Sequence, residues 1–138
     1  MRHRSLPIIV LLNIVTFGLY EFYWYYVTKT ELNVINKREP NVPLYLWFFI
    51  SPINLWWWYR LSKSLNKATK GNISVGLAFF LPLILLAVYV GLVYLLTGQQ
   101  ANISYVDPIG IVALVSTYYI PYLITTLYFQ HKLNKIAK

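Results

Sequence analysis

The sequence predicts an all-α integral membrane protein, a single domain over residues 1–138 with about four transmembrane helices, some broken by glycine or proline, and an interfacial amphipathic helix. Composition is the first reason, because the chain is 58% hydrophobic and 12% charged, whereas a soluble domain is about one quarter charged. The second is that the charged residues gather in short segments between long apolar runs. The third is that lysine and arginine cluster at the ends of those runs, which is typical of helices that leave a membrane.

Four apolar runs are candidates for membrane crossing, which takes roughly 20 helical residues for 30 Å of hydrocarbon. They are residues 6–26, 43–58, 73–96 and 109–129. The second run is the shortest and contains Pro52, which removes a backbone donor. We expect that run to be kinked, thin or re-entrant.

The basic residues predict the orientation of these runs. If the crossings alternate, residues 2–4, 60–70 and 132–138 lie on one side, and this strongly basic side is predicted to be cytoplasmic. The protein is then expected to be a multi-pass protein of the cell (plasma) membrane with both termini in the cytoplasm. Tryptophan and tyrosine near both ends of the runs agree, since these residues favour the headgroup level.

The chain also repeats itself weakly. Residues 21–37 align with residues 54–70, and both segments contain a Leu-Asn pair and end in lysine, while a fainter third copy ends at 133–135. Each Leu-Asn pair follows a helix breaker by about 12 to 14 residues. The breakers are Gly18, Pro52 and Pro121. The repeated unit is interpreted as a broken helix with an amphipathic tail.

The repeat suggests a second topology. If all three tails lie on one face of the membrane, the first two runs dip in and return, and only the last two cross. This alternative puts every basic residue in the cytoplasm, but the exposed backbone of a re-entrant hairpin needs cover from protein. Four spans are the favoured interpretation, and the alternative stays open.

The run LLNIVTFGLYEFYWYYVTKTELN, residues 11–33, contains Thr-x-Gly-x-Tyr, then Tyr-Trp, then Leu-Asn, and it resembles a family of small prokaryotic membrane proteins, domain of unknown function 4234. The C-terminal YFQHKLNKIAK is similar to the Gln-x-x-Leu-Asn pattern that closes that family, whereas Leu19 stands where the family usually has isoleucine. The matching residues are Thr16, Gly18, Tyr20, Tyr23, Trp24, Leu32, Asn33, Gln130, Leu133 and Asn134. The resemblance implies a helical inner-membrane protein of unassigned function, with no catalytic residues to transfer.

Catalysis is not expected from the residues themselves. The few acidic and histidine residues show no spacing that suggests a metal pair or a carboxylate dyad. The chain has no cysteine and no glycine-rich phosphate loop. We therefore expect no enzymatic activity, no cofactor and no metal site. The basic residues are spread over several loops, which also argues against a nucleic-acid partner.

Glu21 is the polar residue that most needs an explanation, because it lies late in the first apolar run. A charged carboxylate there costs several kcal/mol unless it is paired, protonated or near the headgroups. The favoured interpretation is that Glu21 reaches the headgroups among Tyr23 and Trp24. The alternative is an intramembrane polar seam with Asn13, which lies two turns earlier on roughly the same helix face, and with it an ion or proton site.

Residues 60–70 carry the clearest charge pattern. Arg60, Lys63, Lys67 and Lys70 recur at helical spacing opposite an apolar face. This pattern predicts a helix that lies along the cytoplasmic headgroups, and each cation contributes about 1 kcal/mol toward anionic lipid. Ordinary positive-inside anchoring is the favoured interpretation, and contact with anionic lipid or with an acidic partner is the alternative.

Packing signals are abundant and chemistry is scarce, so we expect a non-enzymatic accessory or structural subunit of a larger membrane complex, or a homo-oligomer. The predicted partners are the lipid bilayer and other membrane subunits or further copies of the chain. A small ion or solute transporter or channel that uses Glu21 is the first alternative. A protein that binds anionic lipid through residues 60–70 is the second.

Overall fold

The computed structural model describes residues 2–43, 53–97 and 108–137, and in residues 96–97 and 108–118 it describes the backbone alone. Within these ranges the chain forms five α-helices and no strand, so the predicted all-α class is confirmed. The helices are α1 (Leu6–Val15), α2 (Leu19–Ile35), α3 (Ile53–Ala68), α4 (Val75–Thr97) and α5 (Pro108–Asn134).

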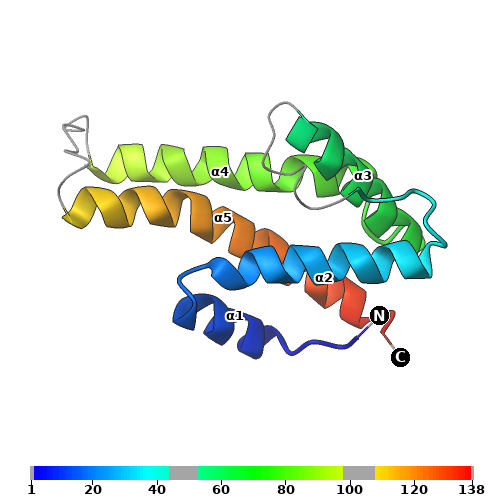
Figure 1. Ribbon diagram of the computed structural model, residues 1–138. Helices are drawn as coiled ribbons and strands as arrows, with labels where there is room; N and C mark the ends of the chain where they lie inside the picture. Colours follow the sequence, from blue (N-terminus) through cyan, green and yellow to red (C-terminus); the bar gives the residue numbers. More distant parts are fainter. Residues whose placement is uncertain (1, 44–52, 98–107, 138) are drawn as a thin grey trace.

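The two longest helices, α4 and α5, lie side by side as a hairpin (Figure 1). In α4 the stretch Val75–Leu95 has a mean hydropathy of 2.5, and only 11% of its most apolar window is buried. The core helix of a soluble protein would instead be mostly covered by its neighbours. Among the described residues, α4 is the one helix long and apolar enough to cross a membrane. The predicted bundle of four spans is therefore not confirmed.

The first apolar run, residues 6–26, forms two helices instead of the single span that the sequence predicted. The chain turns at Phe17 and Gly18, whose φ angles of 50° and 86° are left-handed, and α2 then returns alongside α1 (Figure 1). A Cβ atom on Gly18 would lie 3.0 Å from the ring of Tyr119 in α5. A left-handed φ and this close approach both favour glycine. The helix breaker predicted at Gly18 thus reverses the chain direction.

The second apolar run and the predicted amphipathic segment share one helix, α3. Residues 44–52, with Pro52, lie outside the described residues. The helix buries Trp57, Leu61 and Leu65 on one face, while Lys63 and Lys67 are exposed on the other. The amphipathic character predicted for residues 60–70 is therefore present, but its helix begins at Ile53 and ends at Ala68. Pro121, expected to break a helix, lies inside the continuous α5.

Figure 1 shows both chain termini at one end of the molecule, beside the C-terminal ends of α2 and α5. Most of the buried core lies toward this end. Most of its members are aromatic and leucine side chains from α2, α3 and α5, among them Trp24, Leu32, Trp57, Leu65, Phe129 and Leu133. The leucine of each predicted Leu-Asn repeat, Leu32, Leu65 or Leu133, is fully buried. The repeat thus has a packing role in all three copies.

Candidate functional site

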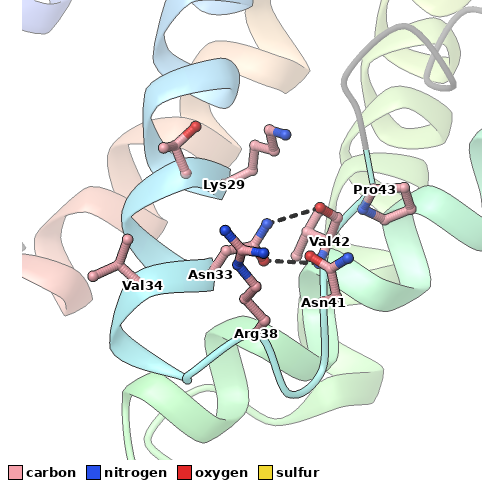
Figure 2. Close-up of a pocket in the computed structure, with 8 residues that line it drawn as sticks. Lys29, Asn33, Val34, Arg38, Asn41, Val42 and Pro43 are labelled. Atoms are coloured by element: carbon pink, nitrogen blue, oxygen red, sulfur yellow. Dashed lines mark hydrogen bonds between the residues drawn. The ribbon is translucent and has the colours of Figure 1, made fainter.

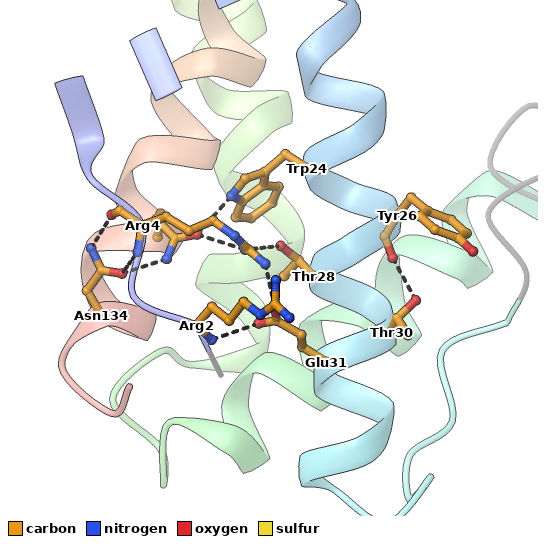
Figure 3. A network of polar contacts seen from close by, with 9 residues as sticks. Arg2, Arg4, Trp24, Tyr26, Thr28, Thr30, Glu31 and Asn134 are labelled. Carbon is orange, nitrogen blue, oxygen red and sulfur yellow. Dashed lines mark hydrogen bonds and ion pairs between the residues drawn. The ribbon is translucent and has the colours of Figure 1, made fainter. Parts of the chain in front are cut away.

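A network of polar side chains joins the N-terminal segment to α2 and α5 (Figure 3). We call it the polar cluster, and its members are Arg4, Trp24, Thr28, Glu31, Gln130 and Asn134. Arg4 forms a salt bridge of 2.6 Å with Glu31, and the exposed fractions of the two side chains are 14% and 17%. Its other guanidinium nitrogen donates to Thr28 Oγ1 and to Gln130 Oε1, each at 3.2 Å.

Gln130 is fully buried and is the centre of the polar cluster. Its Oε1 accepts a hydrogen bond of 2.8 Å from Trp24 Nε1 and one from Arg4. Its Nε2 donates to Asn134 Oδ1 at 2.6 Å. A buried amide needs partners for both its donor and its acceptor, and Gln130 has both. The predicted family residues Trp24, Gln130 and Asn134 thus lie together, although the first is 106 residues from the second.

The side chain of Asn134 forms two hydrogen bonds with the main chain of Arg4. Its Nδ2 donates to the Arg4 carbonyl at 2.7 Å, and its Oδ1 accepts the Arg4 N–H at 3.0 Å. Asn33 does the same for Val42, at 2.9 Å and 2.8 Å. Asn66 donates to the carbonyl of Ile73 at 2.7 Å. In each Leu-Asn repeat, therefore, leucine packs in the core and asparagine binds the backbone of a segment outside its helix.

The helix ends repeat the same geometry. After α2, the N–H of Arg38 donates to the Asn33 carbonyl at 2.6 Å. After α3, the N–H of Gly71 donates to the Asn66 carbonyl at 2.9 Å, and each donor lies five residues after its acceptor. The residues before these donors, Lys37 and Lys70, have φ angles of 53° and 52°. This is the Schellman ending of a helix, in which one residue is left-handed. It supports the alignment of residues 21–37 with residues 54–70.

A further copy of this ending, which we did not predict from the sequence, closes α1. Leu12-Asn13 precedes left-handed Phe17, and Gly18 N–H donates to the Asn13 carbonyl at 2.9 Å. The sequence contains this further Leu-Asn pair, but the pair lies inside a long apolar run that was interpreted as one continuous helix.

Thr16, another predicted family residue, connects α1 to α2. Its hydroxyl donates to the Leu12 carbonyl at 2.8 Å and accepts the N–H of Tyr20 at 3.0 Å. Thr69 makes the matching pair of hydrogen bonds after α3, to Leu65 and from Ile73. Each threonine hydroxyl thus gives an acceptor to one N–H beyond the helix, and it donates to a carbonyl that also accepts a main-chain N–H. Tyr20 is partly buried, whereas Tyr23 is 58% exposed.

Glu21 is buried against α5 instead of reaching outward among Tyr23 and Trp24. Its side chain is 7% exposed, and its Oε2 accepts a hydrogen bond of 2.7 Å from Thr126 Oγ1. Its Oε1 has no hydrogen-bond partner among the described residues. Asn13 is fully buried as well, donates to the Ile9 carbonyl, and has an Oδ1 without a partner in the same part of the chain. The two side chains share no hydrogen bond.

The four cations of the predicted basic stripe differ in their surroundings. Arg60 stacks on Trp56 with 5.6 Å between the guanidinium carbon and the ring centroid, and Lys63 lies 4.8 Å from the centroid of Tyr59. Lys67 donates to the Glu39 carbonyl, and Lys70 is the left-handed residue after α3. The same aromatic-then-cation order recurs in α2, from Tyr26 to Lys29, and in α5, from Tyr128 to Lys132.

No group of three histidine, aspartate or glutamate side chains that would hold a metal ion occurs in residues 2–43, 53–97 and 108–137. The arrangement is one of hydrogen-bonded helix ends and stacked cations. The protein is thus a small helical protein in which polar contacts at one end of the molecule link distant parts of the chain.

Residues 4–56 match the sequence model of a family described as domain of unknown function, DUF4234. The resemblance predicted from the run at residues 11–33 is therefore confirmed for this part of the chain. Gln130, Leu133 and Asn134 lie beyond the matched residues, so their place in the family pattern stays a prediction. The comparisons with curated proteins and with solved structures gave no match.

Proposed function

We propose that this protein is a non-enzymatic membrane protein that acts as a structural or accessory subunit of a larger membrane complex, or as a homo-oligomer. One observation carries the proposal: large apolar side chains are exposed along α1, at the α1–α2 turn and along α4. Leu11, Ile14 and Val15 are each at least 60% exposed, and Phe17 is 92% exposed. In water, exposed apolar side chains of this size and number promote aggregation, whereas lipid or a partner subunit would solvate them.

We further propose that α4 and α5 cross the plasma membrane and that α1 and α2 enter it to about half depth and return, so that both termini lie in the cytoplasm. The length of α1, about 15 Å at 1.5 Å per residue, reaches roughly the middle of the hydrocarbon. Phe17 would lie at the deepest point. For residues 6–26 this placement corresponds to the second of the two topologies considered from the sequence.

Backbone satisfaction at the α1–α2 turn supports a re-entrant hairpin, which requires that no main-chain group meet lipid without a partner. Phe17 N–H donates to the Ile14 carbonyl at 3.2 Å, Gly18 N–H to the Asn13 carbonyl, and Leu19 N–H to the Thr16 carbonyl at 3.1 Å. Thr16 Oγ1 accepts the next N–H, from Tyr20. The N–H groups of the turn thus need no water as a partner.

The order of aromatic and cation supports a common exit side for α2, α3 and α5. In each helix a Trp or Tyr precedes a Lys or Arg by about one turn. Rings favour the headgroup level, and cations extend one step further toward water. Asn36 at the end of α2 donates to Ser64 in α3, and Lys67 reaches the Glu39 carbonyl, so the two helix ends are neighbours.

Cysteine labelling tests this topology, because the chain has no native cysteine. We expect an impermeant maleimide added outside the cell to label a cysteine at Gln100 and to leave Thr30→Cys and Lys63→Cys unlabelled. Thr30 and Lys63 are both exposed in the fold. Labelling of Thr30→Cys from outside would instead support four spans.

The subunit role is tested by purification of the full chain in mild detergent. We expect a homo-oligomer or a complex with other membrane proteins. A lone monomer with no co-purifying partner would contradict the role without contradicting the topology.

A second candidate function, ion or proton transfer, is favoured by one observation, the buried Oε1 of Glu21 that has no partner among the described residues. A buried carboxylate in a membrane region is costly and is therefore often functional. If Glu21 takes part, Glu21→Gln should abolish flux in liposomes. Unchanged flux in that variant would remove this candidate.

A further inference from the structure

A polar groove lies between the last turns of α2 and the chain that follows it, residues 36–43 (Figure 2). Its volume is about 310 Å³. Lys29 and Asn33 line it from the helix, and Arg38, Asn41 and Val42 line it from the segment beyond the helix. The groove is separate from the polar cluster, whose Arg4, Glu31 and Gln130 do not line it.

The groove is held open by the asparagine contact described above. Asn33 binds both the N–H and the carbonyl of Val42, which fixes the returning segment at a set distance from α2. Lys37 and Arg38 both have left-handed φ angles, 53° and 61°. Residues other than glycine adopt this conformation at a cost of about 1–2 kcal/mol each, so the surrounding contacts must impose it. In Figure 2 the Arg38 side chain turns back over α2 toward Asn33.

The lining of the groove is cationic and contains no carboxylate. Lys29 is only 9% exposed, and burial lowers the pKa of its ammonium group. Within the described residues the salt bridge formed is that of Arg4 with Glu31, and it does not involve Lys29 or Arg38. A largely buried cation without a counter-ion is costly. An anion in the groove would offset that cost for Lys29 and would also attract the exposed guanidinium of Arg38.

The geometry fits a phosphate group. Arg38 and Lys29 supply charged donors, and the Asn41 amide supplies a neutral donor. Charge-assisted hydrogen bonds from arginine and lysine are the usual contacts of phosphate oxygens in proteins. Asn33 is occupied with Val42 and serves as the support of the groove wall.

We propose that this groove binds the phosphate of an anionic phospholipid headgroup. The inference rests on the proposed membrane placement, which puts this end of α2 at the headgroup level, one turn beyond Tyr26. The apolar side chains of Val34 and Pro43 also line the groove and suit the glycerol and acyl-chain end of a lipid. The site differs from the stripe at residues 60–70, in which stacking and backbone contacts already engage Arg60, Lys63 and Lys67.

Native mass spectrometry of the full chain in neutral detergent tests the groove, with phosphatidic acid as the probe and phosphatidylcholine as the reference lipid. We expect the double variant Lys29→Gln with Arg38→Gln to lose about tenfold in phosphatidic acid affinity. The matched control, Lys63→Gln with Lys135→Gln, removes the same charge outside the groove and should lose less than about twofold. Equal loss in the two double variants, or no loss in the first, would overturn the proposal.

Two additional arms separate a lipid headgroup from free phosphate and loss of binding from loss of folding. Inorganic phosphate in excess should leave the phosphatidic acid adduct in place, and displacement of the lipid would show that free phosphate is the ligand and overturn the lipid assignment. If the double variant does not fold, Arg38→Gln alone, at an exposed position, should lose about threefold, and no loss would count against the groove. Because these measurements are made in detergent, their outcome does not depend on the labelling result for topology.

Discussion

The two ends of this molecule are built on different principles. At the end that holds both termini, polar side chains cross-link α2, α3, α5 and the N-terminal segment, and the asparagines of the three predicted Leu-Asn repeats bind main chain. At the other end, α4 and the α1–α2 turn expose apolar side chains, and Gly18 approaches Tyr119 closely. Specific hydrogen bonds determine the structure of the first end. At the second end, the close fit of the helices and the surrounding lipid determine it. Variants should therefore destabilise the first end far more than the second.

The largest effect is expected for Trp24→Ala. This change removes a fully buried ring and the hydrogen bond to Gln130, and it should lower the free energy of unfolding by about 3–5 kcal/mol. An SDS titration in mixed micelles, followed by far-UV circular dichroism, measures it. Tyr23→Ala, next in the chain and 58% exposed, is the control, with an expected change below about 1 kcal/mol. Similar losses of unfolding free energy in both variants would mean that the polar cluster contributes no more to stability than an exposed side chain.

Gln130→Leu sharpens the comparison because it keeps most of the volume and removes only the hydrogen bonds. Trp24 Nε1 and one Arg4 nitrogen would lose their acceptor, at an expected cost of about 2–3 kcal/mol in the same titration. Gln130→Glu restores an acceptor, and it should recover part of the loss. A stable Gln130→Leu protein would show that packing, and not the amide, holds the cluster.

Gly18→Ala tests the turn. Its φ of 86° and its 3.0 Å approach to Tyr119 predict a loss of about 1–2 kcal/mol of unfolding free energy. Gly91→Ala in α4 meets nothing within 4 Å and should raise stability by about 0.5–1 kcal/mol. Opposite signs in the two alanine variants are the expected result, and equal signs would contradict the assigned turn.

Phe17→Ser should have the smallest effect on stability, within about 0.5 kcal/mol in micelles, since the ring is 92% exposed. Its effect should appear instead in bilayers, as weaker quenching of an attached probe at Leu19 by lipids brominated near the acyl-chain ends. Unchanged quenching would argue against a tip immersed in lipid.

Much of the fold follows from the sequence, because residue type and spacing carry it. The α4 helix, the break at Gly18 and the amphipathic face of α3 could all be predicted from residue type and spacing. The reversal of α1 onto α2 was only the less favoured of two alternatives, since an apolar run of that length suits a straight span equally well. The contact that turns a break into a reversal, Gly18 against Tyr119, joins positions far apart in the chain.

The polar cluster was predictable only in part. Trp24, Gln130 and Asn134 were identified through the family pattern, but Arg4 was read as one more basic flanking residue. Its partner Glu31 is 27 residues away and has no periodic relation to it. The groove at Lys29 and Arg38 was also missed, because left-handed φ angles at residues other than glycine leave no mark in the sequence.

The clasp between Arg4 and Asn134 has a consequence for biosynthesis. Arg4 has two partners in α5, Gln130 and Asn134. The ribosome adds them 126 and 130 residues after Arg4. Until α5 has been synthesised, the Trp24 indole and the Arg4 main chain lack their hydrogen-bond partners in α5. During that time lipid or an insertase must solvate the N-terminal hairpin. The contacts from α5 thus fix the segment that precedes α1.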